Sequence, residues 1–386
     1  MWLLPLTLLA AAHADVTEWC AVQKSLVVGP TEDADWRALL RNDEGAADRL
    51  VDFVESQHIT RVYVYVGALD TEWEDFYARG ALPEGDSLST LVARLWGVGA
   101  EPVALWSLGE GDYSQRDRAF DLIAAVDAFN ANWYPYPFIG VQAGFAPTDP
   151  DLYDEHINLL ADLRNDRASL TWPMEYSARL PTEWLTETWG DAPLYESALA
   201  AVDHATYDGW TDDRFRMIER GATFLTTADA AVISGELGVL VTADGNPNQT
   251  WYEESLEDPL QVYEELVKVD EGLLTFVQYA GIGITDYAGF FAATHGGLRP
   301  QDHTGIVDGP CLEDPSEDTG EVEVETEDTA LQTEVPDAYP APDYVRSEGA
   351  EDRELIGCGC AAGGPGSSLG GLAGLAFLAA ARRRRP

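Results

Sequence analysis

Acidic residues recur at the ends of short β-rich runs in this sequence. Glu175 and Glu236 each close such a run, while Asp208 and Asp286 each follow one. Two carboxylates on opposite sides of a glycosidic bond can act as the acid and the base of its cleavage. In so acidic a chain, any one of them is also explained as solvated surface. It is their recurrence at run ends that predicts a site, with these four as the catalytic candidates.

Aromatic rings accompany the four carboxylates. The rings are those of Trp106, Trp172, Tyr207 and Tyr287. An aromatic face stacks on the C–H face of a sugar, whose hydroxyls then need nearby acceptors such as carboxylates. The combination favours a carbohydrate ligand and assigns these four rings to binding it.

Other kinds of catalytic chemistry find little support in the sequence. None of the six histidines has paired metal-ligand spacing, since His204 stands alone in a β-rich run and His295 and His303 lie in a polar segment. Within residues 15–311, no G-x-S-x-G nucleophile turn occurs. We therefore expect no metal site and no cofactor.

The elements that carry these residues alternate along the chain. Eight β-rich runs lie at residues 20–22, 61–66, 102–106, 138–143, 169–174, 201–205, 231–236 and 276–284. Segments with helical periodicity lie between them, at residues 46–57, 88–98, 116–130, 149–164, 212–221 and 259–269.

This alternation predicts an α/β fold, a single (β/α)8 TIM-barrel-like domain over residues 15–311. An open doubly wound sheet is the main alternative, but it usually carries a Gly-rich phosphate turn after its first strand, and none is present. In a barrel, the site forms at the C-terminal ends of the strands. The four carboxylates, coming from four strands, would then meet at one mouth.

Several phrases of the sequence resemble a known group of proteins. VYVYVGAL, VALWSLGEG, AFNANWYPYPFIGVQAGFAP and GIGITDYAGFF are similar to segments of glycoside-hydrolase-like TIM barrels distantly related to chitinase-type enzymes. The resemblance implies a barrel that acts on carbohydrate. Residues 138–141 match the start of the family's fourth-strand phrase, but Gln142, Gly144 and Ala146 stand around the positions of its acidic pair, and Asp286 stands where the family has a histidine. The fourth-strand acids of the family therefore do not carry over.

The two ends of the chain predict export and anchoring. Residues 1–14 form an apolar run that ends in a small-x-small pattern typical of a signal peptide. Residues 357–386 contain Cys358 and Cys360, an apolar segment and a closing cluster of arginines. This tail closely resembles the MYXO-CTERM sorting signals of myxobacteria and their relatives. The resemblance implies a processing protease acting near Cys358 or Cys360 and display at the bacterial cell surface. A single retained transmembrane anchor is the alternative.

The charge of the chain restricts its partners. The sequence has 23 Lys and Arg against 68 Asp and Glu, a formal net charge of -45, which argues against nucleic acid as a partner. Residues 312–356 hold sixteen acidic residues and two arginines, the composition of a disordered, self-repelling linker.

Cys20 and Cys311 lie at opposite ends of the predicted barrel. In an oxidising compartment the two can pair as a disulfide that ties the first strand to the segment after the last one.

Two functions remain open at this point. One is a surface-anchored, glycoside-hydrolase-like protein that hydrolyses or binds a carbohydrate at the C-terminal mouth of the barrel. The other is a catalytically inactive barrel that serves as a glycan-binding or structural protein of the cell surface.

Overall fold

The computed structural model describes residues 17–29, 36–69, 80–108, 113, 116–242, 248–252, 259–305, 307 and 309–312. The chain divides into a compact unit, Met1–Asp318, and a second unit, Thr319–Pro386, whose residues all lie outside these ranges. The predicted signal peptide, the linker beyond Leu312 and the sorting signal also lie outside the described residues. Within those residues, no helix combines the length and the apolar character needed to cross a membrane.

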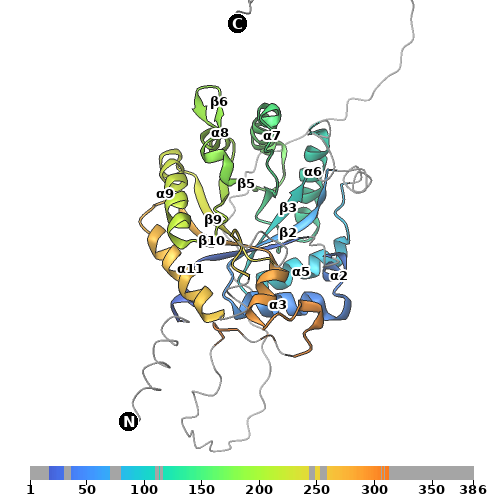
Figure 1. The fold of residues 1–386 in the computed structure, drawn as a ribbon. Helices are drawn as coiled ribbons and strands as arrows, with labels where there is room; N and C mark the ends of the chain where they lie inside the picture. Colours follow the sequence, from blue (N-terminus) through green and yellow to red (C-terminus); the bar gives the residue numbers. More distant parts are fainter. Residues whose placement is uncertain are drawn as a thin grey trace, which may run out of the picture. The chain divides into compact units, whose positions relative to one another are not determined.

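Eight parallel strands close into a barrel (Figure 1). In chain order they are β1 (Lys24–Val28), β2 (Arg61–Ala68), β3 (Glu101–Ser107), β4 (Gly140–Ala143), β5 (Glu175–Leu180), β8 (His204–Asp208), β9 (Ser234–Leu240) and β10 (Tyr279–Thr285). Each strand pairs with the next in this order, and β10 pairs with β1 to complete the ring. The predicted closed barrel is confirmed, and the open-sheet alternative is wrong.

Helices surround the strands on the outside (Figure 1). They are α2 (Trp36–Leu40), α3 (Ala46–Ser56), α5 (Gly85–Gly97), α6 (Arg116–Asn132), α7 (Tyr153–Asp166), α8 (Leu194–Ala200), α9 (Arg214–Ala231), α11 (Pro259–Leu273) and α12 (Tyr287–Thr294). A two-stranded hairpin, β6 (Thr188–Trp189) and β7 (Ala192–Pro193), lies between β5 and α8. The hydrophobic core lies mainly between these helices and the outward-facing side chains of the strands.

Several strands begin later in the sequence than their β-rich runs predict. The largest shifts are those of the first strand, predicted at residues 20–22, and of β5, predicted at residues 169–174. In the segment before β5, the backbone N–H groups of Thr171 and Trp172 donate to the Asp127 carboxylate and not to a neighbouring strand. Glu175 is the first residue of its strand, whereas the sequence pattern placed it at the end.

The disulfide between Cys20 and Cys311 joins the two ends of the described body. Their Cα atoms lie 5.4 Å apart and the residues are separated by 291 positions in the sequence. The Cys311 N–H also donates to the Ser56 carbonyl at the end of α3. The segment that follows α12 is thereby fastened to the start of the barrel.

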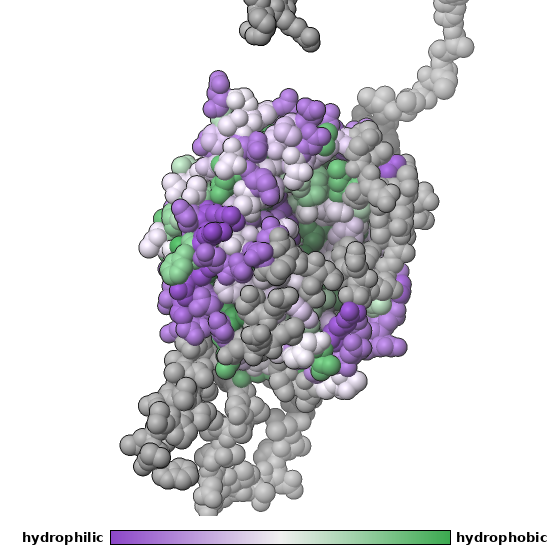
Figure 2. Space-filling model, in the orientation of Figure 1, coloured by the Kyte–Doolittle hydropathy of each residue, from purple (hydrophilic) through white to green (hydrophobic). Residues whose placement is uncertain are grey.

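The described surface is predominantly hydrophilic in the face that Figure 2 shows, with apolar residues scattered over it. This agrees with a chain in which 68 acidic residues are distributed over the sequence.

Candidate functional site

The inside of the barrel is lined by polar side chains, where barrels of this kind are usually filled by Val, Ile and Leu. Glu236 of β9 lies at the centre of this polar lining and is only 4% exposed. Its Oε2 atom accepts hydrogen bonds from the hydroxyls of Ser25 at 2.9 Å, Tyr63 at 3.0 Å and Thr206 at 3.2 Å. Its Oε1 atom lies 3.6 Å from Nε2 of His204. The carboxylate thus connects four strands across the barrel.

The surroundings of Glu236 keep it ionised. Burial alone raises the pKa of a carboxyl group, but His204, Arg61 and the Ser25 hydroxyl outweigh burial and lower the pKa of Glu236 to about 2. A general acid for glycoside cleavage needs a raised pKa instead. Glu236 is therefore a permanent buried anion at neutral pH.

Glu175 lies at the opposite end of the barrel from the predicted mouth. As the first residue of β5, it stands at the N-terminal rim and forms an ion pair of 3.1 Å with Arg61, the first residue of β2. Arg61 also lies 3.6 Å from Glu101, the first residue of β3. The expectation that Glu175 shares the C-terminal mouth is wrong, because its strand starts later than the sequence pattern indicates.

Asp208 and Asp286 do lie at the C-terminal ends of strands, but each contributes to the fold. The Asp208 carboxylate pairs with Arg179 at 2.5 Å, and both side chains are largely buried. Burial raises the pKa of Asp208, while Arg179 opposes that rise. Asp286 caps α12, accepting a hydrogen bond from the Gly289 N–H at 2.7 Å. The structure therefore does not bring the four predicted carboxylates together at one mouth, and their catalytic role stays a prediction.

Three of the four predicted binding rings face the hydrophobic core. Trp106 packs edge-on against Phe145, and Tyr207 stacks on Phe224 of α9 at 5.2 Å. Tyr287 lies in α12 and is almost completely buried. Trp106 lies beside Leu160 and Leu163 of α7, and Phe224 belongs to α9, so both strand rings point outward to the surrounding helices. The expectation that these rings line a mouth is wrong.

Trp172 belongs to an aromatic surface that the sequence reasoning missed. Its ring stacks on Tyr134, with centroids 5.5 Å apart and an angle of 27° between the ring planes. Trp133 and Tyr136 flank Tyr134 in the loop between α6 and β4, and both are exposed. We call Trp133, Tyr134, Tyr136 and Trp172 the aromatic platform. The signal for it was the stretch NANWYPYP, in which prolines at residues 135 and 137 favour an exposed loop.

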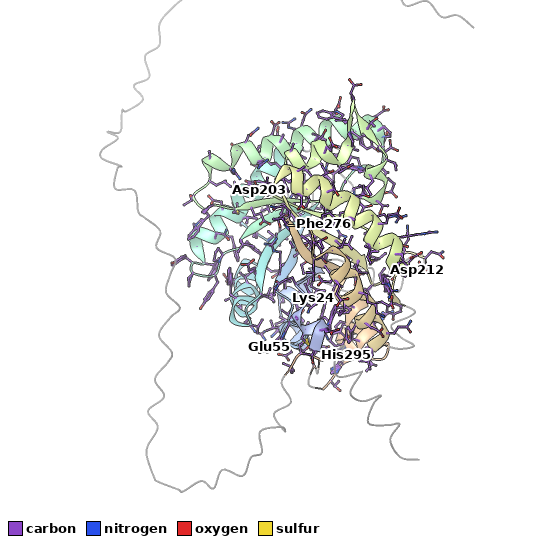
Figure 3. The ribbon with its side chains drawn as sticks, turned by 90° about the vertical axis from the view of Figure 1, so that its left-hand side faces the viewer. Lys24, Glu55, Asp203, Asp212, Phe276 and His295 are labelled. Atoms are coloured by element: carbon purple, nitrogen blue, oxygen red, sulfur yellow. A yellow bond between two sulfur atoms is a disulfide. The ribbon has the colours of Figure 1, made fainter. Side chains whose placement is uncertain are left out.

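The platform is built on two neighbouring loops that precede the paired strands β4 and β5. Asp127 of α6, the helix that precedes the first loop, fixes the second loop by accepting hydrogen bonds from the N–H groups of Thr171 and Trp172, at 3.0 and 2.8 Å. Arg167, at the start of the second loop, pairs with Asp203, which Figure 3 labels. The rings therefore lie on the N-terminal side of the barrel on an anchored support.

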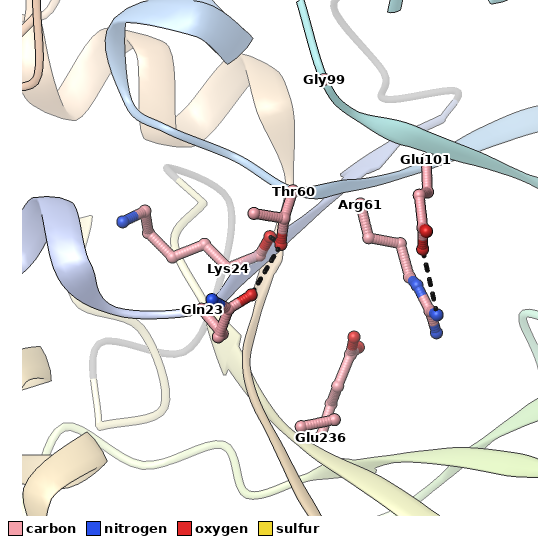
Figure 4. Close-up of a pocket in the computed structure, with 8 residues that line it drawn as sticks. Gln23, Lys24, Thr60, Arg61, Gly99, Glu101 and Glu236 are labelled. Carbon is pink, nitrogen blue, oxygen red and sulfur yellow. Dashed lines mark hydrogen bonds and ion pairs between the residues drawn. The ribbon is translucent and has the colours of Figure 1, made fainter. Parts of the chain in front are cut away.

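A cavity of about 240 Å³ lies at the same end of the barrel. Glu236 and Arg61 contribute to its wall (Figure 4). In the described ranges, no three His, Cys, Asp or Glu side chains are grouped so as to hold a metal ion.

Comparisons with known proteins do not assign this chain to a family. No family model matches the chain and no curated protein matches it. Similar solved structures include the spore cortex-lytic enzyme SleL of Bacillus cereus, with 12% identity and a TM-score of 0.44 over 73% of this chain and 72% of that one. They also include a class V chitinase of Pseudomonas fluorescens, with 13% identity and a TM-score of 0.44 over 72% of this chain and 100% of that one. A GH18 chitinase of Pseudoalteromonas aurantia has 10% identity and a TM-score of 0.45 over 71% of this chain and 96% of that one. Similarity this distant does not indicate an activity for this chain.

Proposed function

We propose that this protein binds a neutral polysaccharide through the aromatic platform and does not hydrolyse it. The observation that carries the proposal is the exposed ring of Tyr134, which stacks on the partly buried Trp172 at 5.5 Å and is flanked by the exposed rings of Trp133 and Tyr136.

The clustering of exposed rings supports a carbohydrate ligand. Trp133 is 40% exposed, Tyr134 59% and Tyr136 45%, and no other Trp or Tyr among the described residues is comparably exposed. In the stacked pair, Trp172 supports one face of Tyr134, so the outer face of Tyr134 and the exposed rings of Trp133 and Tyr136 are the surfaces that can meet the C–H faces of sugars. The tyrosine hydroxyls can bond to sugar hydroxyls. Exposed apolar surface gathered in one place commonly marks a binding site.

The negative charge of the protein favours neutral over anionic polysaccharides as ligands. The platform belongs to a chain of net charge -45, and like charges across an interface disfavour association. An anionic polysaccharide would be repelled. A neutral chain of β-linked pyranoses, with its hydroxyls equatorial and its ring faces apolar, meets no such barrier.

The arrangement of carboxylates supports binding without hydrolysis. Glu236 is held ionised inside the barrel, Glu175 lies at the N-terminal rim, and Asp208 is paired with Arg179. The common two-carboxylate mechanism places the carboxyl groups about 5–9.5 Å apart on either side of one sugar bond. At the β4 end, Gln142, Gly144 and Ala146 stand around the positions of the resembled family's acidic pair.

Sedimentation with insoluble polysaccharide tests the binding site. The parent protein is mixed with cellulose or chitin particles, and the bound fraction is compared with that of Tyr134→Ala/Trp172→Ala. We expect at least a tenfold weaker association in the double variant, about 1.4 kcal/mol of binding free energy. Phe215→Ala is the matched control, because Phe215 is a 71% exposed ring on α9, and it should bind as the parent does. Equal binding by the double variant refutes the platform as the site.

Reducing-sugar release from the same particles tests the absence of hydrolysis. We expect no release above that of a heat-inactivated sample. Release that disappears in Glu175→Gln or Glu236→Gln would restore the hydrolase hypothesis for the predicted carboxylates.

We also propose that the protein is exported and held at the bacterial cell surface. Support comes from residues 1–14 and from the sorting tail with Cys358 and Cys360, all outside the described residues. A chain ending at Leu312 should be released in soluble form into the medium. Retention of that shortened chain in the membrane fraction would require another anchor.

A further inference from the structure

The cavity at the N-terminal mouth of the barrel is separate from the aromatic platform. Its wall is formed by Gln23, Lys24, Thr60, Arg61, Gly99, Glu101, Glu236 and Ala280. These residues come from the starts of strands or from the turns before them. At about 240 Å³, the cavity is close to the lower end of the range of about 300–1,000 Å³ typical of small-molecule sites. Glu101, whose side chain is 47% exposed, stands where the cavity meets solvent.

The two oxygens of Glu236 differ in their bonding. Oε2 accepts all three hydroxyl hydrogen bonds, from Ser25, Tyr63 and Thr206. Oε1 lies 3.6 Å from His204 Nε2, an ion-pair contact that is longer than the three hydroxyl hydrogen bonds. A carboxylate oxygen can accept more than one donor. Because Glu236 lines the cavity, a ligand there can supply a further donor to Oε1.

The charges around the cavity favour a cation with hydroxyl groups. Glu236 and Glu101 are both anionic, and Arg61 is the cation that faces them (Figure 4). Lys24 turns its ammonium group away, donating to the carbonyls of Trp19 at 2.6 Å and Val22 at 2.9 Å. Arg61 can donate to a neutral oxygen of the ligand, and Gln23 and Thr60 add an amide and a hydroxyl to the wall.

We propose that this cavity binds a small hydroxylated amine, such as an amino sugar, whose ammonium group donates to Glu236 Oε1 and whose hydroxyl oxygens accept from Arg61. The ammonium group of such a ligand complements Glu236, and its hydroxyl oxygens complement Arg61. A bare divalent metal ion fits less well, because the Arg61 guanidinium shares the space. A sugar without the amine lacks the positive charge that would add to the ion pairs of Glu236 and Glu101.

Isothermal titration calorimetry with D-glucosamine tests the assignment. The titration is run at about pH 6, where an amine of this type is protonated, with D-glucose, N-acetyl-D-glucosamine and calcium chloride as comparison titrants. We expect saturable binding of D-glucosamine alone. Glu236→Gln should weaken it at least tenfold, and Glu101→Gln, at the exposed edge of the cavity, should weaken it severalfold without disturbing the buried network.

Matched variants separate this site from the platform and from general charge. Glu219→Gln removes one negative charge from the exposed surface of α9 and should bind D-glucosamine as the parent does. Tyr134→Ala/Trp172→Ala should also bind it normally, so failure of either proposal is seen independently of the other. Circular dichroism confirms that each variant is folded. Absence of saturable binding, binding of calcium or glucose in its place, or full affinity in both Glu236→Gln and Glu101→Gln would overturn the proposal.

Discussion

The Tyr63 hydroxyl donates a hydrogen bond of 3.0 Å to Glu236 Oε2 across the inside of the barrel. The bond joins β2 to β9, two strands that are not neighbours in the sheet. Gly283 of β10 makes room for this contact, because a Cβ atom there would lie 3.3 Å from Glu236 Oε2 and 3.2 Å from Ser25 Oγ. The buried carboxylate is thus a structural centre of the barrel as well as part of the cavity wall.

Acid should destabilise the protein through Glu236. Its pKa is about 2 in the folded state against 4.5 for the ordinary group, so its stabilisation is complete above about pH 4.5 and is lost as the pH falls toward 2. A shift of this size corresponds to about 3 kcal/mol. Glu236→Gln should be less stable than the parent at pH 7 and should lose less stability over that acid range. Urea unfolding of the parent and Glu236→Gln between pH 2 and 7 measures the stability at pH 7 and its loss in acid, with Glu219→Gln as the control. If the parent and Glu236→Gln lose stability in parallel as the pH falls, the assignment of this acid sensitivity to Glu236 is wrong.

The Arg179–Asp208 pair gives a second prediction. Arg179→Met leaves a buried carboxylate unpaired and should lower the free energy of unfolding by about 3–5 kcal/mol at pH 7. The loss should shrink as the pH falls, because protonation of Asp208 removes the unpaired charge. Adding Asp208→Asn should recover part of the stability, and a double-mutant cycle by urea unfolding measures the coupling. Strictly additive effects would show that the pair is not coupled.

The disulfide should stabilise the fold because it closes most of the described chain into one loop. Replacing both Cys20 and Cys311 by serine should lower the free energy of unfolding by about 2–5 kcal/mol. A reductant should lower the stability of the parent by a similar amount and leave the double variant unchanged. A reductant effect that persists in the double variant would point to a different cause.

A glycine in β4 tests the close contact between β4 and β5. A Cβ atom at Gly140 would lie 2.5 Å from the Glu175 carbonyl oxygen and 2.9 Å from the Glu175 Cβ. Gly140→Ala should therefore cost about 1–3 kcal/mol or more of stability, since the paired strand must shift. Gly97→Ala is the matched control, because no atom lies within 4 Å of its added Cβ and alanine favours the helix. Thermal unfolding of both variants measures the difference, and equal melting temperatures would be inconsistent with the strand contact.

The barrel was predictable because the periodicity of apolar residues distinguishes strands from helices, and eight strands that alternate with helices are typical of a (β/α)8 fold. Val62, Val64, Ala104 and Val141 all lie in strands as their runs predict. The pairing of Cys20 with Cys311 was expected from their places at the two ends of the predicted body.

The candidate site could not be predicted in the same way, because it depends on where each strand begins and which residues face inward. A one-residue change of position reverses the face on which a side chain lies. β5 begins at Glu175, and the N–H groups of Thr171 and Trp172 before it bond to Asp127, a residue more than forty positions earlier in the sequence. This start places Glu175 at the N-terminal rim and not at the C-terminal mouth.

The sequence by itself determined that a chain with this alternation folds as a barrel, since periodicity is a local property of the residues. The tertiary structure alone decided that Trp106 and Tyr207 enter the core while Trp172 meets Tyr134 at the surface. It also decided that hydroxyls from three other strands surround Glu236. These contacts join residues far apart in the chain, so strand register and ring closure, which no local pattern encodes, determine them.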